Sequence, residues 1–243
     1  MQFAIISDIH ANLDALNAVL KYIGDDIPVV CLGDLVGYGA QPNEVVDSVK
    51  ARAIHTVLGN HDLFCASGLG MNDMNPRAAA AASWTHKNLT QENKEWLLAL
   101  PYLITEPTYA IVHGSPNQPE LFYYVIGERA ITNAFKAATR KVTFVGHSHH
   151  PDISELQPTG KVWNSIVAGN NVFNLHPWAS YIVNVGSIGQ PRDRDTRASF
   201  VVYDDERRTA TWHRVAYNIA VAQAKIRATS LPPDCADRLG VGK

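Results

Sequence analysis

Gly59-Asn60-His61-Asp62 is the stretch that decides the fold. It follows the apolar run Ile54–Leu58, which predicts a short buried β-strand that ends at a glycine. The amide, imidazole and carboxylate groups that come directly after this strand are then expected at the edge of a sheet. In open α/β sheets, the edge at the carboxyl ends of the strands is where ligands bind.

Four further apolar runs lead into clusters of histidine and aspartate. They are Phe3–Ile6 before Asp8 and His10, Val29–Leu32 before Gly33-Asp34, Tyr109–Val112 before His113-Gly114, and Val142–Val145 before Gly146-His147-Ser148-His149. One histidine after one strand carries little information. Five strands that deliver metal-type ligands to one sheet edge indicate a functional site.

The segments between the first strands have the pattern of helices. Asn12 is suited to cap a helix, and apolar residues recur at helical spacing over Leu13–Ile23. Pro42 is expected in the first turn of a second helix. This alternation of strand and helix is typical of parallel βαβ units.

The rest of the chain is expected to add three parts to this core. About residues 63–100 are predicted to form a helical insert over the site, and about 151–215 an antiparallel meander. A terminal helix is predicted over about 218–228, with a loose tail after it. Because no repeat or linker is found, we expect residues 1–243 to form a single domain.

Composition excludes several classes of protein. The 243 residues are 46% hydrophobic, which is ample for a core, and no stretch approaches the roughly 20 apolar residues of a membrane span. A net charge of -2 and a pI near 6.5 give no global signature for nucleic acid or membrane surfaces. Three cysteines without a CxxC pair, and no signal peptide, predict a cytoplasmic protein.

Seven side chains are candidate metal ligands, and they combine carboxylate, imidazole and amide groups without a thiolate. They are Asp8, His10, Asp34, Asn60, His113, His147 and His149. Structural zinc usually takes four ligands rich in cysteine. Seven nitrogen and oxygen ligands instead suit two divalent ions, as in phosphatases and nucleases. Such ligands fit Mn, Fe, Zn, Co or Ni, and we favour manganese.

The ordered series of motifs resembles that of the calcineurin-like metallophosphoesterase superfamily. The series is Asp8-x-His10, Gly33-Asp34-x-x-Gly37, Gly59-Asn60-His61-Asp62, His113-Gly114 and Gly146-His147-Ser148-His149. The resemblance implies an α/β (α+β) fold, a four-layer αββα sandwich of two mixed β-sheets flanked by helices. Such a fold agrees with the two sheets and flanking helices expected from the patterns above.

The resemblance also implies a role for each motif residue. One metal would be held by Asp8, His10 and His149, and the other by Asn60, His113 and His147. Asp34 would bridge the two metals, and a metal-bridging hydroxide would attack the phosphorus. His61 would be the general acid that protonates the leaving oxygen, steadied by Asp62.

The branch of the superfamily bears on the substrate. Phosphoprotein phosphatases of this superfamily carry an arginine shortly after the Gly-Asp motif, where this chain has Val36-Gly37-Tyr38-Gly39. The chain is more similar to the small bacterial and archaeal phosphoesterases, including the YfcE-like branch, which share a segment like 184–192. Without that arginine, a singly charged phosphodiester is favoured over a phosphomonoester dianion. Arg192 or Arg194 could replace the missing charge.

Three residues are therefore candidates for substrate binding: Arg192, Arg194 and Tyr38. The arginines could hold a phosphate by their planar guanidinium groups. They could equally belong to a solvated turn of alternating Arg and Asp side chains. Tyr38 could line a substrate pocket, although aromatic residues in such positions more often only pack.

The patterns together predict a metal-dependent hydrolase of small-molecule phosphate esters, nucleotides among them. Two alternatives stay open. One is a phosphoprotein phosphatase, and the other is a non-catalytic interaction protein on the same fold, as in the retromer subunit that resembles these enzymes. That subunit departs from the pattern at the catalytic histidine, whereas this chain keeps His61. The sequence leaves the oligomeric state open, with a dimer among the options.

Overall fold

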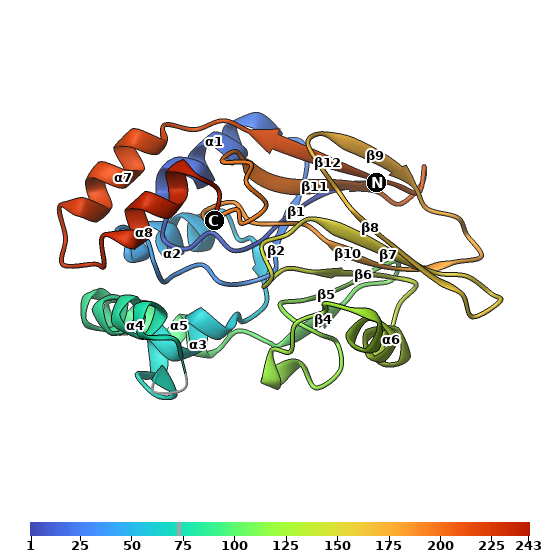
Figure 1. Cartoon of the computed structure of the whole chain (residues 1–243), viewed down its shortest axis with the longest axis horizontal. Coiled ribbons are helices and arrows are strands. Elements are labelled where there is room, and N and C mark those ends of the chain that lie inside the picture. The colour runs from blue at the N-terminus through green and yellow to red at the C-terminus, as the bar shows by residue number, and fades with distance from the viewer. Residues whose placement is uncertain (72–73) are drawn as a thin grey trace.

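The computed structural model describes residues 1–71 and 74–243 (Figure 1). Within these residues, one sheet has the order β3-β2-β1-β11-β12-β9 and the other the order β4-β5-β6-β10-β7-β8. The first sheet contains β1 (Gln2–Ile6), β2 (Val29–Cys31), β3 (His55–Thr56), β9 (Asn171–Asn174), β11 (Ala198–Asp204) and β12 (Thr209–Val215). The second contains β4 (Leu103–Thr105), β5 (Ala110–Val112), β6 (Val142–Val145), β7 (Asp152–Leu156), β8 (Val162–Ile166) and β10 (Ser180–Asn184).

The helices of the described residues lie outside the two sheets (Figure 1). They are α1 (Leu13–Ile23), α2 (Pro42–Ala51), α3 (Asn60–Ser67), α4 (Pro76–Asn88), α5 (Gln91–Leu98), α6 (Glu128–Ala137), α7 (Ile219–Arg227) and α8 (Asp234–Asp237). Short 3₁₀ turns are formed by η2 (Pro119–Leu121) and η3 (Arg238–Gly240). Among the described residues, no helix is long and apolar enough to cross a membrane.

Alternation of side chains along the strands creates the layers. In β1, Ile5 points into the core between the two sheets, whereas Ala4 and Ile6 face the core under α1 and α2. In β10, Ile182 lies in a third core with Ile131 of α6. Three apolar cores separate four layers, so the predicted αββα sandwich of two mixed sheets is confirmed.

Local capping explains where several helices begin. The Asn12 side chain accepts a hydrogen bond from the Ala15 backbone at 3.1 Å, at the start of α1. Pro42 occupies the first turn of α2, where its missing N–H costs nothing. The Thr90 side chain accepts a hydrogen bond from the Asn93 backbone at 3.2 Å, at the start of α5.

The strands after residue 150 do not form one antiparallel meander. β10 pairs with β6 in parallel and with β7 in antiparallel orientation, so it belongs to the second sheet. β11 and β12 form a hairpin in the first sheet. An apolar alternation identifies a strand, but it does not identify the strand's partner, and the prediction of a single meander was wrong for this reason.

The expectation of a loose tail was also wrong. The C-terminal segment, defined here as residues 231–243, folds into α8 and η3. Leu231, Cys235 and Leu239 are buried, and they share an apolar cluster with Tyr38 and Ile226. Their spacing of four residues is helical and was a usable signal, but the neighbouring prolines and charges obscured it.

This packing leads to a stability prediction. Leu239 is 5% exposed, so Leu239→Ala should lower the free energy of unfolding by about 2–5 kcal/mol. Val241, which is 51% exposed in the same segment, provides the matched control. Val241→Ala should change the free energy of unfolding by no more than about 0.5 kcal/mol. Urea denaturation measures both. Equal, small effects would mean that the segment is a loose tail.

Candidate metal centre

The seven candidate ligands converge at the carboxyl ends of β1, β2 and β3 of the first sheet and β5 and β6 of the second. At five of the ligands the backbone turns sharply away from the strand and adopts the left-handed region. Backbone φ is positive at Asp8 (54°), His10 (48°), Asp34 (53°), His147 (65°) and His149 (61°). Residues other than glycine seldom adopt this region, and the strain is tolerated mainly where surrounding contacts impose it, as at active sites.

Two motif glycines allow the loops to approach these carboxylates. A Cβ at Gly59 would lie 2.2 Å from Asp34 Oδ1, and one at Gly146 would lie 2.7 Å from Asp8 Oδ2. Both distances are far inside van der Waals contact. The glycines of these motifs are therefore required for close packing around Asp8 and Asp34.

The first group of ligand atoms comes from Asp8, His10, Asp34 and His149, all buried. His149 Nε2 lies 3.1 Å from both Asp8 Oδ1 and His10 Nε2, and His10 Nε2 lies 3.7 Å from Asp34 Oδ2. Two ligands of one tetrahedral ion at normal bond lengths are about 3.4 Å apart. The spacing of these atoms therefore fits a single ion.

The second group contains Asp34, His113 and His147. His113 Nε2 lies 3.3 Å from Asp34 Oδ2 and 3.2 Å from His147 Nδ1. Asn60 Oδ1 lies 3.1 Å from His113 Nε2. Asp34 Oδ2 is therefore near both groups.

In both Asp8 and Asp34, one carboxylate oxygen accepts hydrogen bonds from the protein and the other accepts none. Asp8 Oδ2 accepts hydrogen bonds from Ser7 Oγ (2.6 Å) and the His147 backbone (3.1 Å), while Asp34 Oδ1 accepts one from the His61 backbone (2.8 Å). Asp8 Oδ1 and Asp34 Oδ2 are buried without a hydrogen-bond partner. Burying such oxygens is costly unless a cation compensates, so these residues fit divalent metal ions.

Backbone carbonyl groups orient three of the imidazole rings through their Nδ1 atoms. Nδ1 of His10, His113 and His149 lies 3.0, 2.8 and 2.6 Å from the carbonyl oxygens of Val36, Leu32 and Gln190, respectively. An Nδ1–H that donates to a carbonyl leaves the Nε2 lone pair free to bind a metal. All three Nε2 atoms face the carboxylate oxygens described above.

Electrostatics separates the two histidines of the second group. Burial lowers the pKa of His113, but the adjacent Asp34 carboxylate outweighs it and raises the pKa to about 9. Burial, aided by the charge of His113, lowers the pKa of His147 to about 3. Metals bind the neutral imidazole, so metal binding at this group would release a proton.

His61 lies beside the ligands but belongs to neither group. Its ring packs 4.6 Å from the Tyr38 ring and 5.0 Å from the His10 ring, measured between centroids. Burial lowers the pKa of His61 to about 4, with the Asp34 carboxylate opposing this shift.

Asp62 does not hold the His61 ring. Its carboxylate accepts hydrogen bonds from the backbones of Val36 and Gly59, both at 3.1 Å, and His61 Nδ1 has no hydrogen-bond partner. The predicted steadying of His61 by Asp62 is therefore wrong. A carboxylate at the third helical position reaches back to the N-cap backbone, which is its usual role in a capping box.

A cavity of about 420 Å³ opens above the two groups. Arg192 and Tyr38 line it, together with Tyr124, whose ring stacks on that of His147 at 3.9 Å. Arg194 does not line it. Its side chain is exposed, and its backbone N–H donates to the Gly242 carbonyl at 2.8 Å.

Several residues in or next to the cavity are not among the site residues predicted from the sequence. Phe64, Met74 and Ala78 line the cavity from the helical insert. Ser7 and Gln190 orient Asp8 and His149. Ser7 directly precedes a ligand, which was a usable signal, whereas the others become neighbours of the site only through tertiary packing.

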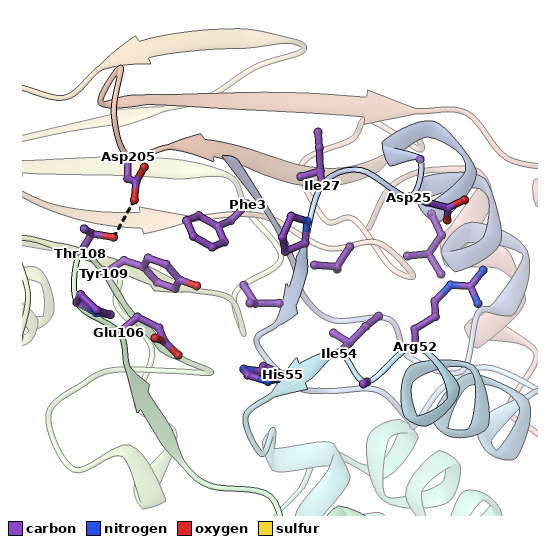
Figure 2. A pocket seen from close by; sticks show the side chains of 17 residues that line it. Phe3, Asp25, Ile27, Arg52, Ile54, His55, Glu106, Thr108, Tyr109 and Asp205 are labelled. Atoms are coloured by element: carbon purple, nitrogen blue, oxygen red, sulfur yellow. Dashed lines mark hydrogen bonds between the residues drawn. The ribbon is translucent and has the colours of Figure 1, made fainter. Parts of the chain in front are cut away.

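The larger cavity of the described residues, about 570 Å³, lies elsewhere (Figure 2). It is lined by the amino ends of β1 and β2 and by residues 52–55 and 106–109. Phe3 and Tyr109 form an aromatic wall, while Arg52 and Glu106 lie apart from each other in Figure 2. No cluster of metal-type ligands among the described residues lines it, so size alone does not identify the site.

Comparisons with known proteins agree with this geometry. A family model described as the calcineurin-like phosphoesterase superfamily domain matches residues 1–208. An uncharacterized protein of Methanocaldococcus jannaschii is 34% identical over 246 residues, which cover 99% of this chain and 98% of that protein.

Two solved structures extend the likeness to the whole fold. A metallophosphoesterase from Sphaerobacter thermophilus is 36% identical with a TM-score of 0.88, over 100% of both chains. A hypothetical protein from Pyrococcus horikoshii has a TM-score of 0.78, over 100% of this chain and 98% of that one. At 22% identity, the second likeness concerns the fold alone.

Proposed function

The chain belongs to the calcineurin-like phosphoesterase superfamily, and we propose that it is a dinuclear-metal hydrolase of small-molecule phosphate esters. Membership supports phosphoester hydrolysis in general, and the buried Asp and His cluster supports divalent metals. The observation that carries the proposal is the pair of ligand groups that share Asp34 under a cavity with His61.

Asp8, His10 and His149 would hold one ion, and Asn60, His113 and His147 the other, with Asp34 shared between them. When bound, the ions would act as Lewis acids toward the phosphate and activate water for attack. Mixed nitrogen and oxygen ligands support a first-row transition metal, and we favour manganese.

His61 is proposed as the general acid that protonates the leaving oxygen. It lines the cavity and is not needed as a ligand, since both groups have enough donors without it. Its pKa in the free protein is low because it is buried, and a bound phosphate would favour the charged imidazolium. Asp62 acts indirectly, through the backbone of the loop that carries Gly59.

Arg192 changes the expected class of ester. The sequence favours a phosphodiester because no arginine follows Asp34, but Arg192 lines the cavity and supplies that positive charge. A phosphomonoester dianion gains more from it than a singly charged diester does. We therefore favour phosphomonoesters, with phosphodiesters as the alternative.

This preference can be tested on one residue. Arg192→Ala should raise KM about tenfold or more for nitrophenyl phosphate, because a charged hydrogen bond is lost. It should raise KM less for the bis-nitrophenyl diester. Arg197, which is exposed and paired with Asp195 in the same loop, provides the control, and Arg197→Ala should leave both values unchanged. Equal losses for both esters would contradict a charge-selective role.

The proposal as a whole is tested by purified, manganese-loaded protein. Elemental analysis should find two ions per chain, and a panel of mono-, di- and cyclic nucleotide esters should contain substrates. Two ions without turnover on any ester would favour the alternative, a non-catalytic interaction protein. Turnover on phosphoproteins alone would favour a phosphoprotein phosphatase.

A further inference from the structure

One wall of the site cavity contains no metal ligands. It consists of Tyr38, Arg192 and the start of α4 at Asn75 and Ala78. The C-terminal segment packs behind Tyr38 through Leu239 and its neighbours. This segment lies beyond residues 1–208, the part that the superfamily model matches.

Positive charge is concentrated at this wall. The guanidinium carbon of Arg192 lies 6.0 Å from the centroid of the Tyr38 ring, and that of Arg238, in η3, lies 5.9 Å from it. Cations and aromatic faces attract each other at this range. Two arginines far apart in sequence thus lie near one aromatic ring, and of these three residues Tyr38 and Arg192 line the cavity.

The charge continues from the metal ligands to Arg238. Arg192 lines the same cavity as His61 and His149, so it is close to the site. Burial lowers the pKa of Arg238, and the charges of Arg192 and Arg77 lower it further. Arg77, in the first turn of α4, is bonded to Asp234 at 3.0 Å.

Nearby carboxylates are occupied elsewhere. Asp193 pairs with Arg214, and Asp195 pairs with Arg197. Within residues 1–71 and 74–243, no Asp or Glu side chain pairs with Arg192 or Arg238. Arg238 Nε donates a hydrogen bond to the backbone oxygen of Lys243 at 2.5 Å, which leaves its terminal NH2 groups for a ligand. Arg192 donates to Gln190 Oε1 at 3.0 Å, and its buried Nε has no hydrogen-bond partner. A buried charged donor without a partner is costly and suits an anionic ligand.

We propose that Arg238 forms an anion subsite that extends the anion site of Arg192 away from the metal centre. The substrate is then a phosphate ester carrying a second anionic group, such as another phosphate, which Arg238 binds while Arg192 binds the scissile phosphate. The inference rests on the proposed phosphoesterase function and narrows its substrate class. Guanidinium groups match the oxygens of phosphate in both geometry and charge. The start of α4 adds the partial positive charge of a helix N-terminus.

The test compares pairs of ligands that differ only by the second anion. Alkane monophosphonates and the matching α,ω-bisphosphonates of increasing length cannot be hydrolysed at the carbon–phosphorus bond. Isothermal titration calorimetry of each pair on the metal-loaded full chain measures the ratio of their affinities. For at least one length, the bisphosphonate should bind about tenfold or more tightly.

Variants assign that ratio to Arg238. Arg238→Ala should reduce the ratio to near one, whereas Arg238→Lys should keep part of it. Arg227→Ala is the matched control, since Arg227 is 52% exposed and pairs with Asp237 at the surface near the same segment. Circular dichroism and metal content verify folding. If Arg238→Ala does not fold, the affinity ratio measured in Arg238→Lys decides. Because the compact ammonium group of lysine cannot replace the planar guanidinium group, an unchanged ratio in Arg238→Lys overturns the proposal.

The outcomes separate this inference from the proposed function. Equal affinities for every pair in the unmodified protein, or an unchanged ratio in Arg238→Ala, overturn the subsite. If such a protein still holds two ions and hydrolyses nitrophenyl phosphate, the phosphoesterase proposal stands without the subsite. If it holds no metal and cleaves no ester, the phosphoesterase proposal fails first.

Discussion

Asp34→Asn is expected to lose metal and activity together. Asp34 Oδ2 is within 3.7 Å of His10 Nε2 and 3.3 Å of His113 Nε2, one from each ligand group. The amide removes one negative charge from both ion sites at once. Because the ions are proposed to stabilise the transition state by several kcal/mol, and 1.36 kcal/mol is tenfold in rate, kcat/KM should fall by about 10³-fold or more.

Elemental analysis and ester hydrolysis measure the two effects on the same sample. Asp14→Asn is the matched control, because Asp14 pairs with Lys225 on α7, away from the ligands, and should keep both properties. Two ions per chain with normal turnover in Asp34→Asn would falsify the bridging role. Loss of one ion only would assign Asp34 to a single site.

The candidate site could be predicted largely because its ligands are local to strand ends. Each motif couples a buried strand to the residues directly after it. The parallel strands β1 and β2 of the first sheet and β5 and β6 of the second then bring those residues together at their carboxyl ends. The motif glycines add a second local constraint, since a side chain at Gly59 would collide with Asp34. Local sequence therefore carries both the position and the spacing of these groups.

What was missed depends on contacts between distant segments. Arg192 enters the cavity while Arg194, two residues later, bonds through its backbone to Gly242, and nothing in the alternating Arg/Asp pattern distinguishes them. Asp62 was assigned to its neighbour His61, but the start of α3 directs its carboxylate toward backbone N–H groups. The C-terminal segment is ordered by burial against Tyr38, on a loop about two hundred residues earlier.

His61→Gln is expected to keep both metals and to lose rate in proportion to how much the leaving group needs a proton. General acid catalysis is worth about 10²–10⁴-fold, so kcat for an alkyl phosphate should fall within that range. A nitrophenyl leaving group is stable as an anion and needs little protonation, so its loss should be smaller. Glutamine is polar and of similar reach but cannot donate a proton to a leaving oxygen as an acid.

The comparison of the two leaving groups separates catalysis from positioning. His55→Gln is the control, since His55 is exposed and lines the cavity at the opposite ends of the strands. Metal content, kcat and KM for both esters are measured in each variant. Equal losses for both esters would indicate that His61 positions substrate or metal, because a lost proton donor affects the poorer leaving group more strongly. An unchanged kcat for both would remove His61 from the mechanism and leave the leaving oxygen to be protonated by water.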